Sequence, residues 1–324
     1  MAPAARDSGG PIAISVIVPV YNEELNVDEL HERIAAVLKD GDVEFLFIDD
    51  GSTDRTFERL TALAARDPRI RLIRFRRNYG QTAALSAGID HARGEIIVPM
   101  DGDLQNDPQD IPRLLARIEE GYDVVSGWRV HRQDPLRKRI PSMFANRLIS
   151  WISGVHLHDY GCSLKAYRRS VLQDVRLYGE MHRFVPIYAS WQGARVTELA
   201  VQHHPRTRGK SNYGIERTVK VVLDLVVVKF LSSYATKPIY VFGGFGLGAF
   251  AAAIAAFLLM LWFKFFSSDP KDFIQTPLPM VVAMFVLVGC LSLLLGLVAE
   301  LTVRTYYESQ GKRTYTMVQS GDNR

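Results

Sequence analysis

Two long uncharged stretches constrain the fold of this chain more than any other feature of its 324 residues. Residues 239–263 and 276–299 contain no Asp, Glu, Lys or Arg. Each stretch exceeds the ~20 residues that a helix needs to cross the core of a bilayer. Buried core helices are the alternative, but charge-free runs of this length are typical of membrane spans. The pattern therefore predicts two transmembrane helices, at about 239–263 and 276–300.

The charges around these stretches predict the orientation of the helices. The short link at 264–275 has two lysines offset by two aspartates, so the helices form a hairpin whose two ends lie on the same side. The flanks are basic, with Arg217, Lys220, Lys229 and Lys237 before the hairpin and Arg304, Lys312 and Arg313 after it. By the positive-inside rule, the main domain and both termini are expected in the cytoplasm. Inside the first span, Gly244 and Gly248 form a GxxxG pattern, which predicts a helix-packing face.

Composition narrows the set of partners. The net charge of +4 and the pI of about 9.0 suit an anionic membrane surface or phosphate-containing substrates, and with two spans present we do not expect nucleic acid. Cys162 and Cys290 form neither a disulfide framework nor a zinc site, which is consistent with a reducing compartment. Residues 1–11 show no signal peptide and are predicted to be a disordered lead-in.

Strand and helix patterns alternate through the first part of the chain. Dense apolar and β-branched runs predict strands at 12–20, 45–48, 69–75, 96–100 and 123–127. Apolar residues at helical spacing predict helices at 26–39, 82–92 and 111–120. This alternation predicts an α/β fold, with a mainly parallel sheet that carries helices on both faces.

Acidic residues follow three of these strands. The segments are Tyr21-Asn22-Glu23, Asp49-Asp50 and Asp101-Gly102-Asp103. The carboxyl ends of parallel strands share one edge of the sheet, where ligands bind in open α/β folds. Taken singly, Asp50 could cap a helix, Glu23 could be a solvated acid, and the Asp-x-Asp triplet could be a solvated turn. Together, like charges on one edge repel each other unless a cation or donor hydroxyls use them.

The third acidic segment has the composition of a cation site. Asp101 and Asp103 can converge on Mg²⁺ or Mn²⁺ because a glycine separates them, and Gln105 adds a neutral oxygen. Phosphate oxygens would be natural remaining ligands. His203 and His204 are adjacent in a Pro/Gly loop and lack the spacing of zinc ligands, so we do not assign them a metal.

Basic residues gather in two later regions. Between 129 and 147 they alternate with apolar residues at helical spacing, which predicts an amphipathic helix for a membrane surface or a phosphate group, although several of them also suit a solvated helix face. The loop at 203–211 is cationic, and residues 215–234 predict a helix in the membrane interface that leads into the first span.

Four ordered motifs resemble those of one enzyme family. They are Val18-Pro19-Val20-Tyr21-Asn22-Glu23, Ile48-Asp49-Asp50-Gly51-Ser52-Thr53-Asp54, Arg77-Asn78-Tyr79-Gly80-Gln81 and Asp101-Gly102-Asp103-Leu104-Gln105. Together they resemble the inverting GT-A glycosyltransferases of the dolichol-phosphate mannose synthase group. The stretches 132–134 and 159–169, with Glu300, Arg304 and Tyr306, are similar to a bacterial branch of that group. This branch holds undecaprenyl-phosphate 4-deoxy-4-formamido-L-arabinose transferase and related polyprenyl-phosphate glucosyltransferases.

The resemblance implies an architecture and an activity. A Rossmann-like GT-A catalytic domain would span 12–214, followed by an interfacial amphipathic helix at 215–237, a transmembrane hairpin at 238–303 and a cytoplasmic tail at 304–324. The enzyme would move a sugar from a nucleoside-diphosphate sugar, with UDP favoured, to undecaprenyl or another polyprenyl phosphate, with inversion. It would act at the cytoplasmic face of the inner membrane, in the cell envelope, as a multi-pass protein and a homo-oligomer, a tetramer by resemblance.

The resemblance also implies roles for individual residues. The donor would be bound by Pro19, Tyr21, Glu23, Asp50, Gln81 and Asp101. The acceptor phosphate would be bound by Arg129, Arg137, Lys138, Arg206 and Ser211. Asp103 and Gln105 would be the ligands of a divalent cation, Mg²⁺ or Mn²⁺. The catalytic groups would be Asp101, Asp103 and Asp159, the last as a base or an orienting residue.

Two departures and two alternatives accompany this interpretation. The family often has Asp-Ala-Asp where this chain has Gly102, which is expected to loosen the loop. It often has Ser-Lys-Tyr where this chain has Ser211-Asn212-Tyr213, so Lys210 would supply the missing charge. A processive polysaccharide synthase would need a Gln-x-x-Arg-Trp element and more spans. A non-catalytic scaffold that binds lipid phosphate has no need for the retained acidic motifs.

Overall fold

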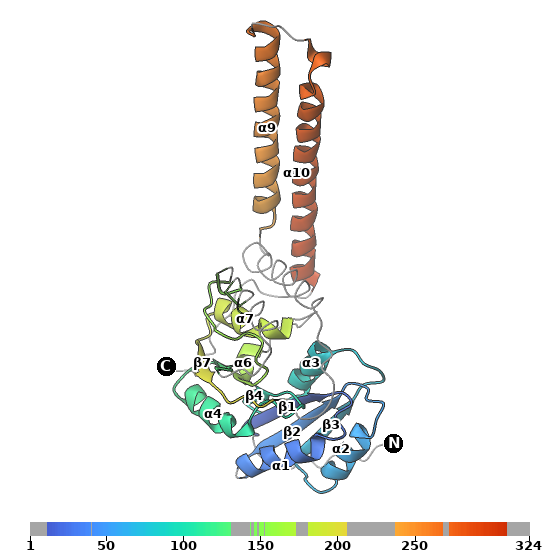
Figure 1. The fold of residues 1–324 in the computed structure, drawn as a ribbon, viewed down its shortest axis with the longest axis vertical. Helices are drawn as coiled ribbons and strands as arrows, with labels where there is room; N and C mark the ends of the chain where they lie inside the picture. The colour runs from blue at the N-terminus through green and yellow to red at the C-terminus, as the bar shows by residue number, and fades with distance from the viewer. Residues whose placement is uncertain are drawn as a thin grey trace. The chain divides into compact units, whose positions relative to one another are not determined.

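The structure is a computed structural model that describes residues 12–39, 41–130, 143, 146–147, 149–151, 153–172, 181–205, 237–267 and 272–309. The chain divides into two compact units, Met1–Val228 and Lys229–Arg324. The predicted interfacial helix at 215–237 lies outside the described residues except for Lys237, and the boundaries predicted at 214 and 215 therefore stay predictions. Figure 1 shows the elements of both units.

The described part of the first unit is built on one seven-stranded sheet. Its strands are β1 (Ile14–Val20), β2 (Val43–Asp49), β3 (Ile70–Arg74), β4 (Ile96–Pro99), β5 (Val124–Trp128), β6 (Lys165–Arg168) and β7 (Val196–Ala200). They follow the order β3-β2-β1-β4-β6-β5-β7. All neighbouring pairs are parallel except those of β6, which runs antiparallel to β4 and β5. The prediction of a mainly parallel sheet is confirmed, although the sequence did not indicate β6 and β7.

Helices cover both faces of this sheet, as expected. They are α1 (Val27–Val37), α2 (Thr56–Ala64), α3 (Gln81–His91), α4 (Ile111–Glu119), α6 (Arg169–Leu172) and α7 (Val185–Trp191), with short 3₁₀ turns η1 (Pro108–Asp110) and η2 (Met181–Arg183). Successive strand residues point to opposite faces. On β2, Phe45 packs in the cluster that contains α1, α2 and α4, whereas Leu46 packs in the cluster that contains α3 and α7.

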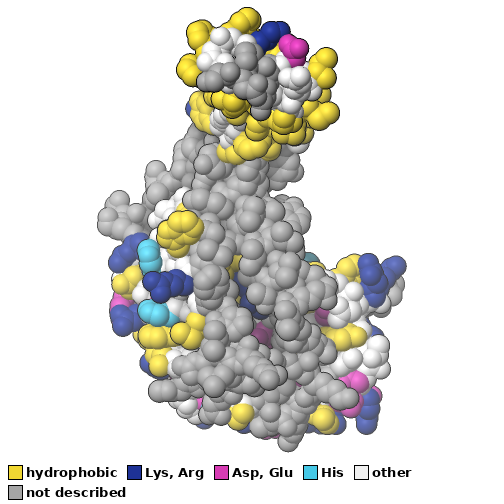
Figure 2. All heavy atoms as spheres, turned by 45° about the horizontal axis from the view of Figure 1, so that its top comes forward, with side chains coloured by type: hydrophobic (Ala, Val, Ile, Leu, Met, Phe, Trp, Pro, Cys, Tyr) yellow, Lys and Arg dark blue, Asp and Glu magenta, His cyan; other side chains and the backbone are white. Residues whose placement is uncertain are grey.

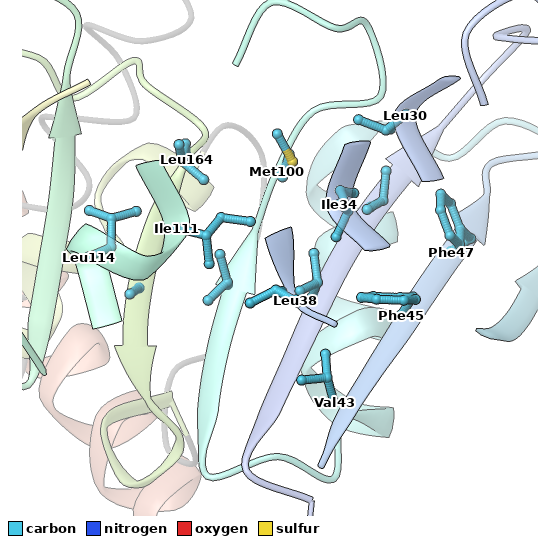
Figure 3. Close-up of a cluster of buried hydrophobic side chains, with 14 of the residues drawn as sticks. Leu30, Ile34, Leu38, Val43, Phe45, Phe47, Met100, Ile111, Leu114 and Leu164 are labelled. Atoms are coloured by element: carbon cyan, nitrogen blue, oxygen red, sulfur yellow. The ribbon is translucent and has the colours of Figure 1, made fainter. Parts of the chain in front are cut away.

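The core under α1 illustrates how the sequence pattern becomes packing. Figure 3 shows Leu30 and Ile34 of α1 facing Phe45 and Phe47 of β2, and all four side chains are at most 1 % exposed. Burial of each such side chain stabilises the fold by roughly 1.5–3 kcal/mol. The same cluster includes Met100, directly after β4, and so holds the start of the acidic segment in place.

The register of β1 with its neighbours brings the three acidic segments together. Val20 pairs with Asp49 of β2, and Ile17 pairs with Pro99 of β4, both in parallel. Because β2, β1 and β4 are adjacent and parallel, the chain leaves all three strands at the same edge of the sheet.

The second unit contains two long apolar helices. Helix α9 (Ile239–Phe265) and helix α10 (Leu278–Ser309) lie side by side, with a 3₁₀ turn η3 (Phe273–Gln275) between them (Figure 1). Ile239–Phe265 and Leu278–Val303 are long and apolar enough to cross a membrane. Many of their apolar side chains are exposed, and Figure 2 shows hydrophobic side chains over the described surface of this unit. The two predicted spans therefore correspond to helices, and α10 continues beyond the predicted end.

The contact between α9 and α10 does not use the predicted GxxxG pattern. A Cβ added at Gly244 or Gly248 would meet no atom within 4 Å. A Cβ at Gly246 would instead lie 3.0 Å from the carbonyl oxygen of Gly289, and one at Gly289 would lie 2.9 Å from the Phe250 ring. The GxxxG pattern therefore does not mark the face of α9 that meets α10, and its role as a packing face for another helix stays a prediction.

Candidate active site at the carboxyl edge of the sheet

The loops after β1 and β2 are tied together by an asparagine. Asn22 adopts a left-handed backbone conformation with φ of 55°, which asparagine tolerates better than most residues. Its side-chain oxygen accepts a hydrogen bond from the Thr53 N–H at 2.9 Å, and its own N–H donates to the Ser52 hydroxyl at 3.0 Å. Asn22 was not among the predicted site residues. An asparagine directly after a strand is a common turn residue, and this could have identified it. Tyr21 is exposed beside it, so the edge presents an aromatic ring.

Asp50 is buried at the end of β2 and holds the turn that precedes α3. Its carboxylate oxygens accept hydrogen bonds from the backbone N–H groups of Tyr79 at 2.7 Å and Gly80 at 2.9 Å. Burial raises the pKa of Asp50, and these two hydrogen bonds act in the opposite direction. The helix-cap alternative fails, because it is Asp54 that accepts from the N–H of Thr56 at the start of α2. Asp50 thus links two of the motifs that carried the resemblance.

Asp101 lies between the start of α3 and the second half of the sheet. Its Oδ1 atom accepts a hydrogen bond from Gln81 Nε2 at 2.7 Å. Burial raises its pKa, and so does the neighbouring Asp103, whereas Ser163, Arg129 and Lys165 oppose that shift. The structure therefore brings two predicted donor residues, Gln81 and Asp101, into direct contact.

The two residues inside the acidic segment shape its backbone. A Cβ added at Gly102 would lie 2.8 Å from Val20 Cγ1 and 3.3 Å from the Pro19 carbonyl oxygen. The glycine therefore lets the segment pack closely on β1, and the expectation that it loosens the loop is wrong. Leu104 has a φ of 61°, a left-handed conformation that is unusual for leucine and bends the chain before Gln105.

Asp103 and Gln105 are placed as a small oxygen-ligand set. Asp103 is buried, and its Oδ1 accepts from the Gln105 N–H at 3.2 Å. The Gln105 side-chain amide nitrogen donates to the His204 carbonyl oxygen at 3.5 Å, so the oxygen of that amide is the atom a cation would use. Among the described residues, no group of three or more His, Cys, Asp or Glu side chains is placed to hold a metal ion. Mg²⁺ suits such a site, because it is commonly bound by one or two protein ligands while substrate phosphates complete its coordination.

His204 has a structural role beside this segment. Its backbone N–H donates to the Gln105 carbonyl oxygen at 2.8 Å, and its Nε2 lies 3.0 Å from Asp107 Oδ2. These contacts bring the beginning of the cationic loop next to the predicted metal ligands.

A buried ion pair lies across from the acidic segment. Arg129, directly after β5, donates from Nε to Asp159 Oδ2 at 2.6 Å and from Nη2 to Asp159 Oδ1 at 3.0 Å. The Gly161 N–H also donates to Asp159, at 3.0 Å. Burial opposes the charge of Arg129, but the ion pair with Asp159 raises the pKa of its guanidinium above the ordinary value. The pair uses two of the five guanidinium N–H groups, and Asp159 is held in one orientation.

Two residues to which the sequence analysis gave no role hold the segment that follows Asp159. Lys165 is buried at the start of β6 and donates from Nζ to the carbonyl oxygens of Tyr160 and Cys162. In the same segment, the Ser163 hydroxyl accepts a hydrogen bond from Asn106 Nδ2 at 2.7 Å. Hydropathy does not indicate that a lysine is buried, so only the motif at 159–169 pointed to this region. Of the predicted acceptor residues, Arg137, Lys138, Arg206 and Ser211 lie outside the described residues.

The sequence and the fold were compared with known proteins. The sequence model "Glycosyl transferase family 2" matches residues 15–176. Dodecaprenyl-phosphate galacturonate synthase from Rhizobium johnstonii is 42% identical over 319 residues, which covers 96% of this chain and 94% of the relative. Undecaprenyl-phosphate 4-deoxy-4-formamido-L-arabinose transferase from Shewanella sediminis is 36% identical over 307 residues, covering 93% and 90%.

Solved structures share the fold at lower identity. Glucosyl-3-phosphoglycerate synthase from Mycobacterium tuberculosis, in complex with Mn²⁺, UDP and phosphoglyceric acid, has a TM-score of 0.51 and 21% identity, covering 68% of this chain and 78% of that structure. A mycobacterial protein has a TM-score of 0.52 and 23% identity, covering 67% and 74%. Both cover about two thirds of the chain and support the GT-A fold.

Proposed function

The chain belongs to glycosyl transferase family 2, and on this premise we propose that it transfers a sugar from a nucleoside-diphosphate sugar to a polyprenyl phosphate. The Rhizobium and Shewanella relatives, whose names specify polyprenyl-phosphate acceptors, match over nearly the full chain. The observation that carries the proposal is the position of Asp101. It accepts a hydrogen bond from Gln81 on the donor side and lies among Asp103, Arg129 and Lys165.

The donor is assigned to the edge formed by β1, β2 and β4. Pro19, Tyr21, Glu23 and Asp50 would bind the nucleoside, and Gln81 with Asp101 would bind the sugar and diphosphate. The support is that Asn22 joins the loops after β1 and β2, Asp50 joins the β2 loop to the turn before α3, and Gln81 joins that turn to Asp101. A rigid, preformed edge lowers the entropy cost of binding a flexible nucleotide sugar. UDP is the proposed nucleotide, through the resemblance to the bacterial branch.

A divalent cation, Mg²⁺ or Mn²⁺, is assigned to Asp103 and Gln105. The residues fit such an ion, because burial and the neighbouring carboxylate of Asp103 raise the pKa of Asp101, and a cation relieves the repulsion between these two carboxylates. When bound, the cation would stabilise the negative charge on the departing nucleoside diphosphate. Gln105 presents its amide oxygen while its nitrogen contacts the loop at His204.

The acceptor phosphate is assigned to the side of the Arg129–Asp159 pair. A phosphate monoester has its second pKa near 6, so it is largely ionised at neutral pH and needs no strong base. Asp159 is held by Arg129 and by the Gly161 N–H, which favours an orienting role over a proton-accepting one. Arg137, Lys138, Arg206 and Ser211 are proposed to complete the acceptor site.

The two apolar helices are proposed to anchor the enzyme where its lipid substrate resides. Each is long and apolar enough to cross a membrane, and the basic flanks favour a cytoplasmic catalytic domain and cytoplasmic termini. We further propose the inner membrane, an interfacial helix at 215–237 and a homo-oligomer. The catalytic domain would then receive its acceptor head group at the membrane surface and its nucleotide sugar from the cytoplasm.

The test is product identification. The full chain in undecaprenyl-phosphate-containing vesicles is incubated with a panel of UDP- and GDP-sugars and with Mg²⁺ or Mn²⁺. The expected product is a lipid-linked sugar with inverted anomeric configuration, identified by mass spectrometry and NMR, together with released nucleoside diphosphate. Sugar polymer instead of a single-sugar lipid would indicate a processive synthase, and the absence of any transfer would support a non-catalytic lipid-phosphate binder.

A further inference from the structure

A short segment far along the chain reaches both sides of the candidate site. Met181 and Phe184 are buried, and Phe184 shares a hydrophobic cluster with Tyr160, the residue before Gly161. Between them, His182 Nδ1 lies 2.7 Å from the hydroxyl of Thr82. Thr82 is in the first turn of α3, directly after the Gln81 that binds Asp101. Two buried anchors and one polar contact therefore fix the backbone on either side of Arg183.

Arg183 and Arg129 flank the same backbone position. A Cβ added at Gly161 would lie 3.3 Å from Arg129 Nη2 and 3.6 Å from Arg183 Nη1. The two guanidinium groups thus approach one point from two different elements, the end of β5 and η2. Because residue 161 is a glycine, it places no side chain of its own between the two guanidinium groups.

Charged groups gather around Gly161. Arg129, Arg183 and the buried Lys165 supply three cations, and Asp159 lies 3.5 Å from the same Cβ position. Burial lowers the pKa of Lys165; Cys162 and Asp159 oppose that shift, and the charges of Arg129 and Arg183 add to it. Arg129 uses two of its five N–H donors for Asp159. Paired arginines suit the oxygens of a phosphate, because each presents a planar set of donors.

We propose that Arg183 binds the phosphate of the lipid acceptor together with Arg129, across Gly161. The inference rests on the proposed function and adds a residue to its acceptor site. The acceptor is favoured over the donor diphosphate because Arg183 approaches the Arg129–Asp159 pair, whereas the donor edge is formed by the loops after β1, β2 and β4. His182 is a structural anchor of this segment and need not touch either substrate.

The experiment compares Arg183→Gln, Arg183→Lys and the matched control Arg169→Gln in the full chain. Arg169 is an exposed arginine whose Nη1 donates to the Arg93 carbonyl oxygen at 3.2 Å, at the other end of β6 from Lys165. Initial rates of sugar transfer give the KM for undecaprenyl phosphate and the KM for the nucleotide sugar separately. Thermal unfolding with and without farnesyl phosphate reports phosphate binding without catalysis.

Arg183→Gln is expected to raise the KM for undecaprenyl phosphate about tenfold or more, the effect of losing one charged hydrogen bond. Its KM for the nucleotide sugar should stay within about twofold of wild type by the same reasoning, since no donor contact is lost. The increase in Tm caused by farnesyl phosphate should disappear. Arg183→Lys should recover part of the affinity, because lysine keeps the charge but not the planar donor pair. Arg169→Gln should match the wild type in every respect.

Two results would overturn the inference. One is an unchanged KM for the lipid phosphate in a folded Arg183→Gln protein, and the other is a rise confined to the nucleotide sugar. If Arg183→Gln does not fold, an Arg183→Lys protein with unchanged lipid KM and an unchanged farnesyl phosphate effect overturns it equally. Failure of the wild-type protein to transfer any sugar would contradict the proposed function instead. In that case, loss of the farnesyl phosphate effect in Arg183→Gln alone would still support Arg183 as a phosphate-binding residue.

Discussion

The two sides of the candidate site are built in different ways. On the donor side, carboxylates are held by neutral groups: Asp50 by two backbone N–H groups and Asp101 by the Gln81 amide. On the acceptor side, charges are held by charges, since Arg129 and Asp159 form a two-bond ion pair. Neutral donors leave the negative charge of a carboxylate available to a cation or a hydroxyl, whereas the ion pair largely neutralises its own members. The comparison predicts that donor-side changes affect ligands first and that acceptor-side changes affect the fold as well.

The largest effect is expected from Asp103→Ala. Loss of the buried carboxylate removes one of the two proposed cation ligands, and the transfer rate should fall by about 10³-fold or more. The thermal stability should change little or rise, because a like-charged neighbour of Asp101 is removed. The matched control Asp90→Ala, on the exposed far end of α3, should retain full activity. Undiminished transfer by Asp103→Ala in the presence of metal would show that the cation site is elsewhere.

On the acceptor side, Arg129→Ala should harm both folding and binding. The side chains of Arg129 and Asp159 are 14% and 6% exposed, so removing one leaves the other buried without its main partner. The free energy of unfolding should fall by about 3–5 kcal/mol, and the KM for the lipid phosphate should rise. A double-mutant cycle with Asp159→Ala, followed by chemical denaturation, measures the coupling. Additive losses in the two single variants would contradict the ion pair as a structural unit.

The raised pKa of Asp101 predicts how the stability of the fold depends on pH. Burial and Asp103 raise the pKa of Asp101, so the folded chain binds this proton more tightly than the unfolded chain does. The ionised carboxylate therefore destabilises the fold at neutral pH, and this cost disappears as the pH falls below the raised pKa. Asp101→Asn should accordingly raise the Tm at pH 7 while lowering activity, and the gain in Tm should shrink toward acidic pH. Thermal melts from pH 4 to pH 8 check this, and a gain that grows with acid would contradict it.

The smallest effects are expected from two glycine substitutions. In Gly102→Ala the new Cβ meets Val20 and the Pro19 carbonyl oxygen on the donor side, and in Gly161→Ala it meets Arg129 and Arg183 on the acceptor side. Both changes should cost about 1–3 kcal/mol or less, as typical overpacking does. Gly102→Ala should raise the KM for the nucleotide sugar, and Gly161→Ala the KM for the lipid phosphate, each only a few fold. Steady-state kinetics with each substrate varied in turn measures both constants. An effect of Gly102→Ala on the lipid phosphate alone, or of Gly161→Ala on the nucleotide sugar alone, would contradict the assignment.

The shared edge that carries the residues assigned to the donor could be predicted from the sequence, because its signals are local. Apolar strand runs that end in acidic residues, repeated with helices between them, imply parallel strands and a shared edge. That topology places the loops after β2 and β3 next to each other, so Asp50 is expected near Tyr79 and Gly80. It does not predict the individual hydrogen bonds between them. The two long apolar helices were equally clear, because their length and lack of charge can be read directly from the sequence.

The acceptor side could not be predicted to the same depth, because its contacts join distant segments. Lys165 looks like a surface residue in the sequence, yet it is buried in the antiparallel strand β6. Thr82 and His182 are 100 residues apart, and no local pattern indicates that they meet. In the hairpin, Gly246 and Gly289 lie at the contact between α9 and α10, and the Gly244–Gly248 spacing could not indicate this because the contact depends on the rotation of the two helices.

The most direct test of a site with two separate sides is the division of KM effects between Asp50→Asn and Arg129→Lys. Both variants are made in the full chain, and transfer is measured with the nucleotide sugar and undecaprenyl phosphate varied in turn. We predict that Asp50→Asn raises the KM for the nucleotide sugar alone, and that Arg129→Lys raises the KM for the lipid phosphate alone. A rise in the opposite constant for either variant would contradict the assignment of donor and acceptor to the two sides.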